Sequence, residues 1–560
     1  MTNTFQVRPL SLVAQEVGLS PSDLIPFGKD KAKLDAKLLT TRPQPSGRLI
    51  LVSAINPTPA GEGKTTTAIG LQMGLRRIGK RAMLALREPS LGPVFGVKGG
   101  GTGGGRASLY PADDINLHFT GDLHAITTAH NLLAALTDNA IYYRQRFGDK
   151  GELDGRQVML SRALDMNDRF LRRCIIGLGG KAHGSPREAR FDITAASEVM
   201  AVLALSSSYD DLRARLGRIV VGATESGQPV TADDLQATQA MVAVLRDALL
   251  PNLVQTMEGG PALVHCGPFA NIAHGCSSVL ATELGLGLSD YLVTEAGFGF
   301  DLGGEKFLDL KCRQLGVWPR VVVLVATLRA LKLHGGAKLA QAAAPDAGAL
   351  ERGMAHLGKH LDSLKRFGLP AVVAINAFPD DTEAELQQVE AAVAQLGAKA
   401  ARSTAFAHGG AGAVALAEIV ADLAERSDAQ PPKPQYLYEL DDSFQVKLEK
   451  IARTVYGAAS VNVSATAQKD LDRLSAWGYG KLPICVAKTQ LSLSDEPSRV
   501  GLPTGHTITV REVRLSAGAG FLVALTGEIV TMPGLPQKPA AWNIALTDSG
   551  KVRGLMQNDG

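Results

Sequence analysis

The stretch LILVSAINPTPAGEGKT, residues 49–65, decides the fold class. Its first six residues form an apolar run typical of a buried strand. After the turn, apolar side chains recur three to four positions apart, as in Ile69 and Met73, which indicates a helix. A glycine-rich turn between a strand and a helix is the setting of a Walker A phosphate-binding loop. The stretch therefore predicts an α/β protein that binds phosphates at one edge of its sheet.

The turn itself carries the residues that such a loop needs. Gly61 and Gly63 let backbone N–H groups face the phosphates, Lys64 can bridge the β- and γ-phosphates, and the Thr65 hydroxyl can ligate Mg²⁺. Thr58 stands where the pattern usually has glycine, and the alternative is an ordinary glycine-rich turn. We expect the whole loop to bind a nucleotide: Thr58, Pro59, Ala60, Gly61, Glu62, Gly63, Lys64 and Thr65.

Four further apolar runs, each followed by an amphipathic stretch, indicate a mostly parallel sheet with helices on both faces. They are residues 82–86, 291–294, 321–326 and 371–375. Sheets of this kind bind their ligands outside the carboxyl ends of the strands. We therefore expect the functional site among residues 56–65, 87–89, 295–301, 327–332 and 376–381.

Two compositional changes mark expected domain boundaries: an Ala-rich stretch at residues 337–349 and three prolines among residues 430–434. We predict a P-loop NTPase-like domain and two smaller α/β domains, at residues 1–345, 346–430 and 431–560. The last of these begins with a helical pattern and ends in two strand-like segments, residues 507–513 and 521–526.

Charged and glycine-rich residues near the loop extend the expected site. Arg87 can direct its planar guanidinium at a carboxylate or phosphate, although a local ion pair with Glu88 is an equal alternative. Asp122 is, with Glu88, a candidate oxygen ligand for a cation, and its alternative role is to cap a helix.

Residues 92–105 hold eight glycines in fourteen positions. We expect no helix or stable strand there but a loop whose backbone approaches a ligand or a neighbouring chain.

The overall composition excludes several classes of protein. The chain has 58 Lys and Arg against 55 Asp and Glu, and its net charge of +3 is too small for a nucleic-acid-binding surface. The apolar runs are shorter than the roughly 18 residues of a membrane span, and the N-terminus lacks the apolar core of a secretory signal. Five scattered cysteines without a C-x-x-C pair favour a reducing cytoplasm.

Five ordered blocks together resemble the formate–tetrahydrofolate ligase family, also called formyltetrahydrofolate synthetases. The blocks are TPAGEGKTTT (58–67), REPS (87–90), GVKGGGTGGG (96–105), EAGFGFDLGGEKF (295–307) and VATLRALKLHGG (325–336). A tail block at residues 518–536 matches as well, so the resemblance spans nearly the whole monofunctional chain.

The resemblance implies ATP-dependent joining of formate and tetrahydrofolate to give 10-formyltetrahydrofolate, ADP and phosphate, through formyl phosphate. It implies that residues 1–345 hold ATP and formyl phosphate and that residues 346–430 contribute to the folate site. Activation by K⁺ or NH₄⁺, Mg²⁺ bound with ATP, and a cytoplasmic homotetramer are implied too. Nucleic acid and membranes are not expected partners.

Site residues carry over from the family one by one. Lys64 and Arg87 match the catalytic residues around the formyl phosphate, and Glu88 and Asp122 match positions associated with the monovalent cation. The aromatic residues that sandwich the pterin match Phe298, Phe378 and Phe406. The family usually has Trp where this chain has Phe406, which shortens the stacking surface and puts folate affinity in doubt; Phe300 and Arg106 also depart from the usual residue types.

Rival interpretations come from other classes. Lys64 and Arg87 would equally serve a P-loop enzyme that phosphorylates a carboxylate, as dethiobiotin synthetase does, and the three phenylalanines argue against it. A MinD-like nucleotide switch carries a second lysine at the position of Pro59. A purely structural protein would leave the phosphate loop without a role. His265, Cys266, His274 and Cys276 lack the spacing of a zinc site, and we expect the block at residues 271–276 in the cleft wall or core.

Overall fold

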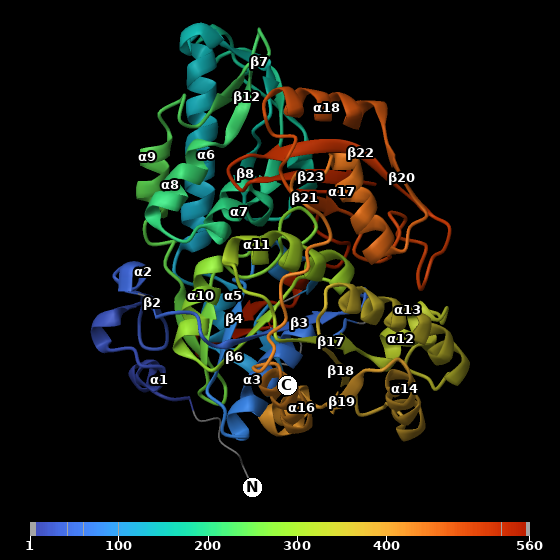
Figure 1. Ribbon diagram of the computed structural model, residues 1–560. Helices are drawn as coiled ribbons and strands as arrows, with labels where there is room; N and C mark the ends of the chain where they lie inside the picture. Colours follow the sequence, from blue (N-terminus) through green and yellow to red (C-terminus); the bar gives the residue numbers. More distant parts are fainter. Residues whose placement is uncertain (1–6, 42, 60, 99, 528, 556–560) are drawn as a thin grey trace.

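The computed structural model describes residues 7–41, 43–59, 61–98, 100–527 and 529–555 and has one large, mixed sheet at its centre (Figure 1). The strand order is β1-β2-β14-β15-β4-β16-β3-β17-β18-β19, and the seven strands from β15 to β19 are parallel. These strands are β1 (Leu24–Pro26), β2 (Ala32–Leu34), β14 (Asn252–Thr256), β15 (Pro261–Val264), β4 (Ala82–Leu86), β16 (Tyr291–Glu295), β3 (Arg48–Ala54), β17 (Val321–Ala326), β18 (Ala371–Asn376) and β19 (Lys399–Ser403).

The five strands predicted from apolar runs all lie in this parallel part. β4 and β17 have the predicted bounds, and β3, β16 and β18 differ from them by one residue at one end. Their side chains alternate between two hydrophobic cores, which is the consequence of the two-residue period of a strand. Ile50, Val52 and Ala54 belong to one core, and Leu49 and Leu51 belong to the other.

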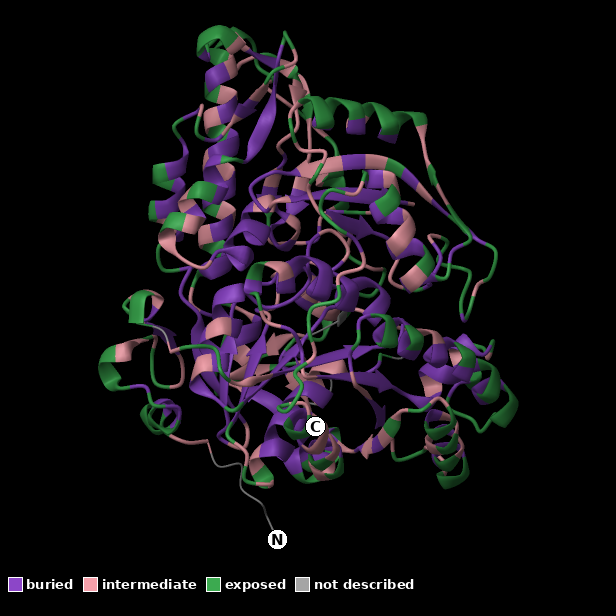
Figure 2. Ribbon diagram, viewed as in Figure 1, coloured by how far each residue is buried: buried purple, intermediate pink, exposed green. Residues whose placement is uncertain are grey.

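Helices cover both faces of the large sheet, as predicted. On one face α3 (Lys64–Arg77) and α16 (Val414–Arg426) pack against it, below the sheet in Figure 1. The core of the other face includes α10 (Val279–Leu288), α12 (Leu328–His334), α13 (Ala347–Arg366) and a continuous helix of mixed geometry over residues 300–315 that ends in α11 (Cys312–Leu315). Figure 2 shows the strands between these layers as buried.

Two further groups of elements lie above the large sheet in Figure 1. One contains a three-stranded sheet, β13-β12-β7, and the helices α6 (Asp122–Tyr142), α7 (Glu198–Leu205), α8 (Tyr209–Gly217) and α9 (Thr238–Leu245); its strands are β7 (Leu153–Val158), β12 (Val220–Thr224) and β13 (Pro229–Thr231). The other is a four-stranded sheet, β20-β22-β23-β21, with α17 (Phe444–Ile451) and α18 (Ala465–Ala476); its strands are β20 (Ser460–Val463), β21 (Ile484–Ala487), β22 (Thr507–Ser516) and β23 (Phe521–Thr526).

Helix starts follow from local sequence. Ser, Thr or Asp side chains accept a hydrogen bond from a backbone N–H in the first turn of eight α-helices of the described chain, which satisfies one of the donors that a helix start leaves free. The capping residues are Ser197, Ser208, Ser278, Thr327, Asp346, Thr382, Ser443 and Ser464, and the last three precede α14 (Glu383–Gln395), α17 and α18.

The glycine-rich residues 92–105 depart from the sequence-based expectation. Val94–Lys98 is a helical turn of the wide, π type that follows α4 (Leu91–Pro93), and Gly103–Gly104 forms the short strand β5, paired with β6 (Ala107–Tyr110). The prediction that this segment holds no helix was therefore wrong for its first half. Val94 is buried there, and its packing outweighs the weak helix propensity of neighbouring glycines.

The three-domain division stays a prediction. β17 and β18, on either side of residue 345, pair in parallel within the same sheet, whereas the four-stranded sheet is built wholly from residues 460–526. Among the residues that the structure describes, one helical stretch, Ala405–Arg426, reaches the length and apolarity of a membrane span. It comprises α15 (Ala405–His408) and α16, and Gly70 and Gly74 of α3 pack directly on its Ala405 and Ala413.

Candidate active site

The carboxyl ends of β3, β16 and β4 lie side by side near the middle of the large sheet. β16 pairs in parallel with β3 on one side and with β4 on the other. The phosphate loop after β3 and the turn at Arg87 after β4 therefore share one edge, with the residues that follow β16 between them. Edges of this kind bind ligands in open α/β sheets.

The phosphate loop is held closed by its own side chains and by β18. Gly61 and Gly63 have φ values of 73° and 69°, a left-handed conformation that favours glycine. Glu62 accepts a hydrogen bond from Thr58 N at 2.7 Å, and Asn376 Nδ2 donates to Glu62 O at 3.0 Å. A Cβ on Gly63 would lie 2.4 Å from Asn376 Nδ2, so a side chain is excluded there. Ala60 lies outside the described residues.

The residues after β16 hold the polar ends of the loop. Lys64 Nζ donates to Phe298 O at 2.8 Å, and Thr65 Oγ1 donates to Glu295 Oε2 at 2.8 Å. Arg87 Nη1 donates to Pro268 O at 3.2 Å, and a Cβ on Gly297 would lie 3.1 Å from the same nitrogen. Lys64 and Arg87 thus both approach residues 297–298.

The charges at this edge favour an anion. Burial lowers the pKa of Lys64, and the Arg87 guanidinium lowers it further, against the opposing effect of Glu295 and Glu62. Arg87 Nε is buried and has no hydrogen-bond partner in the described part of the chain. Since a buried donor without a partner is costly, this nitrogen is matched to an acceptor that a substrate would bring.

Two non-glycine residues with left-handed backbone flank the Arg87 turn. Phe298 has a φ of 58° and Cys266 one of 54°, a conformation that costs about 1–3 kcal/mol per residue. The carbonyls of both residues accept key hydrogen bonds: Phe298 O from Lys64, and Cys266 O from Glu88 N at 2.8 Å. A strained backbone of this kind persists only where the surrounding structure holds it in place, and such residues are concentrated at functional sites.

The expected cation ligands, Glu88 and Asp122, lie near one another behind Arg87. Burial raises the pKa of Glu88 well above its usual range, the Asp122 carboxylate raises it further, and the Lys33 ammonium opposes both. Asp122 is bound by Lys33, with Nζ to Oδ1 at 2.7 Å, and by Asn252 Nδ2 at 2.9 Å. Glu88 Oε2 is a buried oxygen without a partner among the described residues, which suits a cation ligand.

The three candidate pterin-binding rings all follow strands at the same edge. Phe298 follows β16, Phe378 follows β18 and Phe406 follows β19 in α15. Phe298 and Phe378 are half-buried and Phe406 is 39% exposed, so none of the three is sealed in a core. The guanidinium carbon of Arg329 lies 4.6 Å from the ring centre of Phe378.

The glycine-rich segment packs beneath Phe406. A Cβ on Gly104 would lie 3.0 Å from Phe406 Cε2, and one on Gly105 would lie 2.2 Å from Phe406 O, so only glycine lets this backbone pass. Arg106 N donates to that same oxygen at 2.8 Å. The backbone of this segment was expected to approach a ligand or a neighbouring chain. In the structure it approaches Phe406 of the same chain.

Comparison with known proteins adds a second, independent line of evidence. The profile of the formate–tetrahydrofolate ligase family matches residues 1–556. A formate–tetrahydrofolate ligase of Myxococcus xanthus is 60% identical over 553 residues, which are 99% of this chain and 100% of the relative. The enzymes of that name from Symbiobacterium thermophilum and Allorhizobium ampelinum are 54% identical over 552 residues and 53% identical over 549, in each case 98% of this chain, and 98% and 97% of the relatives.

The chain belongs to the formate–tetrahydrofolate ligase family. It is therefore an enzyme, a ligase of one-carbon folate metabolism, as the resemblance predicted. Family membership excludes the three rival interpretations of the phosphate loop, which were a carboxylate kinase, a nucleotide switch and a purely structural protein.

The His–Cys block is buried, as expected for a ligase of this family. His265, Cys266, His274 and Cys276 are each at most 1% exposed. Both ring nitrogens of His265 are engaged, by Ser278 Oγ at 2.7 Å and Ala248 O at 2.8 Å. Among the described residues, no group of three or more His, Cys, Asp or Glu could hold a metal ion.

Some residues of the candidate site were only partly visible in the sequence. Glu295 and Asn376 fall in the stretches expected after strands, but nothing in the sequence showed that they would bind Thr65 and the Glu62 backbone. Lys33 was missed altogether, because its contacts span more than 80 residues. Cys266 was considered only as a zinc ligand, because a left-handed cysteine has no sequence signal.

Proposed function

We propose that this chain joins formate to tetrahydrofolate at the expense of ATP and gives 10-formyltetrahydrofolate, ADP and phosphate through formyl phosphate. One observation carries the proposal: Lys64 and Arg87, two half-buried cations, both approach residues 297–298 at the carboxyl edge of the sheet. A terminal phosphate and a one-carbon acid would meet between them. Such a place concentrates positive charge where the transferring phosphoryl group develops negative charge.

In the first step a formate oxygen attacks the γ-phosphorus of ATP, and the bond from that phosphorus to the bridging oxygen breaks to release ADP. Lys64 would leave Phe298 O for the phosphates, and the Thr65 hydroxyl would turn from Glu295 to the Mg²⁺ that arrives with ATP. Arg87 would hold formate, with the unpartnered Nε supplying a donor.

In the second step N10 of the folate attacks the formyl carbon. The bond between the formyl carbon and the oxygen that bridges it to phosphorus breaks. N10 loses its proton, and phosphate leaves from the positive site that bound it. Phe298, Phe378 and Phe406 would hold the pterin, since flat rings stack well on exposed or half-buried aromatic faces.

The proposal extends to the fold class and the ions. The strand β3, the loop with two left-handed glycines and α3 support a P-loop NTPase-like arrangement for residues 58–65.

Glu88 Oε2, which is buried and has no hydrogen-bond partner among the described residues, supports a bound K⁺ or NH₄⁺. Asp122 already binds the Lys33 ammonium, so its part in such a site would be to fix Lys33 beside the ion.

We further propose that the enzyme works as a homotetramer in the cytoplasm. Four apolar side chains in residues 164–178 support an assembly, because they are exposed: Phe170 by 86%, Ile175 by 65%, Leu178 by 64% and Leu164 by 38%. Exposed apolar residues that gather in one place mark interaction sites.

Isotope transfer tests the reaction path. The enzyme is supplied with ATP, Mg²⁺, tetrahydrofolate and ¹⁸O-labelled formate, and the released phosphate is examined by mass spectrometry. We expect one labelled oxygen in each phosphate, because the formate oxygen that attacks phosphorus leaves with it. Unlabelled phosphate alongside labelled 10-formyltetrahydrofolate would show that no formyl phosphate forms.

A further inference from the structure

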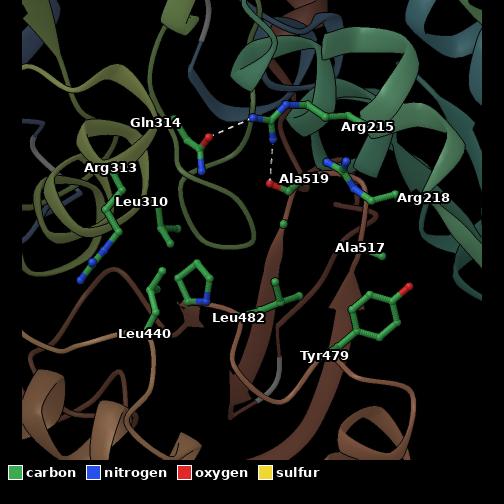
Figure 3. A pocket seen from close by; sticks show the side chains of 12 residues that line it. Arg215, Arg218, Leu310, Arg313, Gln314, Leu440, Tyr479, Leu482, Ala517 and Ala519 are labelled. Carbon is green, nitrogen blue, oxygen red and sulfur yellow. Dashed lines mark hydrogen bonds between the residues drawn. The ribbon is translucent and has the colours of Figure 1, made fainter. Parts of the chain in front are cut away.

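One cavity of the described structure differs in its lining from the proposed active site (Figure 3). Its volume is about 430 Å³, and it contains none of the residues expected to bind ATP, formate or folate. Five parts of the chain meet there: the end of α8, the last turns of the helix over residues 300–315, residue 440 before α17, residues 479–483 before β21, and the turn between β22 and β23. A volume of this order is typical of sites for drug-sized or nucleotide-sized ligands.

Three arginines line the cavity, and each is held differently. Arg215 is fixed by Asp211 Oδ1 at 2.9 Å, Gln314 Oε1 at 2.9 Å and Ala519 O at 3.3 Å; Figure 3 shows the last two bonds. A guanidinium has five N–H donors, so these three bonds leave two unused. The Arg215 guanidinium group therefore has a fixed orientation before an anion binds, which lowers the entropy cost of binding.

Arg218 supplies the uncompensated charge. It follows α8 directly and is exposed, and its side chain makes no hydrogen bond or ion pair with another residue of the described chain. Arg313, by contrast, stacks on Tyr436 at 3.8 Å and donates to Asp309 O at 2.8 Å, so its guanidinium is already engaged. No Asp or Glu is among the residues that line the cavity.

Apart from the arginines and Gln314, the lining is apolar with one aromatic ring. Its larger aliphatic residues are Leu310, Leu440, Leu482 and Pro483, and Tyr479 lies on the same side as Arg218 in Figure 3. A ligand that matched this surface would combine an anionic group with a flat or apolar body. A fully hydroxylated sugar phosphate would leave the apolar side uncovered.

The turn between β22 and β23 belongs to a block that the proposed reaction leaves unexplained. Ala517, Ala519 and Gly520 line the cavity, and Gly518 between them would place a Cβ 2.7 Å from Arg215 O. Gly518 N donates to Glu198 Oε1 at 2.7 Å, which ties the turn to the start of α7. The glycine thus brings the tail backbone against α8 and closes the cavity.

We propose that this cavity is an accessory binding site for a small organic phosphate of nucleotide size. Its phosphate lies between Arg218 and the free donors of Arg215, and its base or other flat body covers Leu440, Leu482 and Tyr479. Two guanidinium groups without a lining carboxylate suit a phosphate dianion, which accepts bonds from several donors at once.

Calorimetric titration with 5′-AMP tests the site on the full-length enzyme. AMP lacks the β- and γ-phosphates that the Lys64 loop is expected to bind, so it is a selective probe. We expect the Arg218→Glu variant to bind AMP at least about tenfold more weakly than wild type, which is about 1.4 kcal/mol. Arg218→Gln keeps a neutral side chain of similar length and should lose less affinity.

The matched control is Arg213→Glu in α8, the helix that Arg218 follows; the Arg213 side chain is 40% exposed and paired with Asp210. This variant should bind AMP as wild type does, and all three variants should keep the wild-type KM for ATP. Adenosine should bind more weakly than AMP by a similar factor, since it has no phosphate. Equal AMP affinity in wild type and Arg218→Glu, or no AMP binding at millimolar concentration in wild type, would overturn the proposal.

Discussion

Lys64 and Arg87 supply the positive charge that the proposed phosphoryl transfer needs. We expect Lys64→Ala and Arg87→Ala each to lower kcat by about 10²–10³-fold, the range seen when one charge-stabilising donor is removed. Neither change should lower the melting temperature appreciably, because both side chains are bound through single hydrogen bonds to carbonyls. Steady-state kinetics and thermal melts measure the two effects.

Arg81→Ala is the control for the Arg87 variant, since Arg81 lies just before the opposite end of the same strand and its side chain is 61% exposed. It should keep wild-type activity. Full activity in Lys64→Ala or Arg87→Ala would remove that residue from the mechanism.

Phe406 is the second residue-scale test, because the family usually has tryptophan there. The ring is 39% exposed and rests on Gly104, so a larger indole can extend toward solvent without displacing the backbone. We expect Phe406→Trp to lower the KM for tetrahydrofolate about two- to fivefold, since aromatic stacking contributes about 0.5–1.5 kcal/mol beyond buried area. The KM for ATP should not change. An unchanged or higher KM for tetrahydrofolate would argue that Phe406 does not touch the pterin.

At the scale of elements, sequence patterns predicted the parts of the fold that local chemistry determines. The parallel strands were visible because they are buried on both faces and are therefore apolar throughout, as in Val321–Ala326. β19 was not visible, since its sequence KAARS is mostly polar and it forms only by pairing with β18. β14 likewise reads as ordinary polar sequence, and its pairing with β2 joins residues about 220 positions apart.

The same division holds for the candidate site. The loop residues Gly61, Gly63 and Lys64 are adjacent in sequence, so their pattern alone predicted a phosphate site. The support from Asn376 and Glu295 depends on strand order, which the sequence leaves open. The helical turn Val94–Lys98 was missed for a related reason: its stability comes from packing rather than from propensity.

The helix over residues 300–315 carries a buried acid pair that predicts a pH effect. Glu305 and Asp309 are both fully buried. Burial raises the pKa of Asp309 to about 7, and burial together with the Asp309 charge raises the pKa of Glu305 well above its usual range. The native state thus keeps a proton that the unfolded chain has lost, so stability falls as pH rises from about 4.5 through these raised pKa values.

Glu305→Gln removes one of these titrations. We expect its free energy of unfolding to fall less steeply between pH 5.5 and 8.5 than that of wild type, by up to about 1.4 kcal/mol per pH unit. Urea midpoints at several pH values measure the slope. Glu418→Gln, at an exposed position of α16, is the control and should leave the wild-type slope unchanged. A Glu305→Gln slope equal to that of wild type would show that the pair does not hold the proton.

At the scale of the whole molecule, the exposed apolar residues 164–178 call for an explanation that a single chain does not provide. The segment is held firmly: Arg172 Nε donates to Met532 O at 2.9 Å, and Arg169 donates to Leu535 O. Phe170, between these two arginines, is nevertheless 86% exposed. A rigid apolar surface in water has an unfavourable free energy, which contact with a second copy would remove.

Phe170→Glu tests this assembly. A buried carboxylate without a partner costs several kcal/mol at an interface, so the variant should dissociate to dimers or monomers at micromolar concentration while wild type stays a tetramer. Light scattering coupled to size-exclusion chromatography measures the mass. Leu12→Glu places the same charge on α1 (Leu10–Glu16), at a side chain 47% exposed, and should leave the mass unchanged. If Phe170→Glu keeps the wild-type mass, the exposed apolar residues serve something other than self-association, and the tetramer must form through another face.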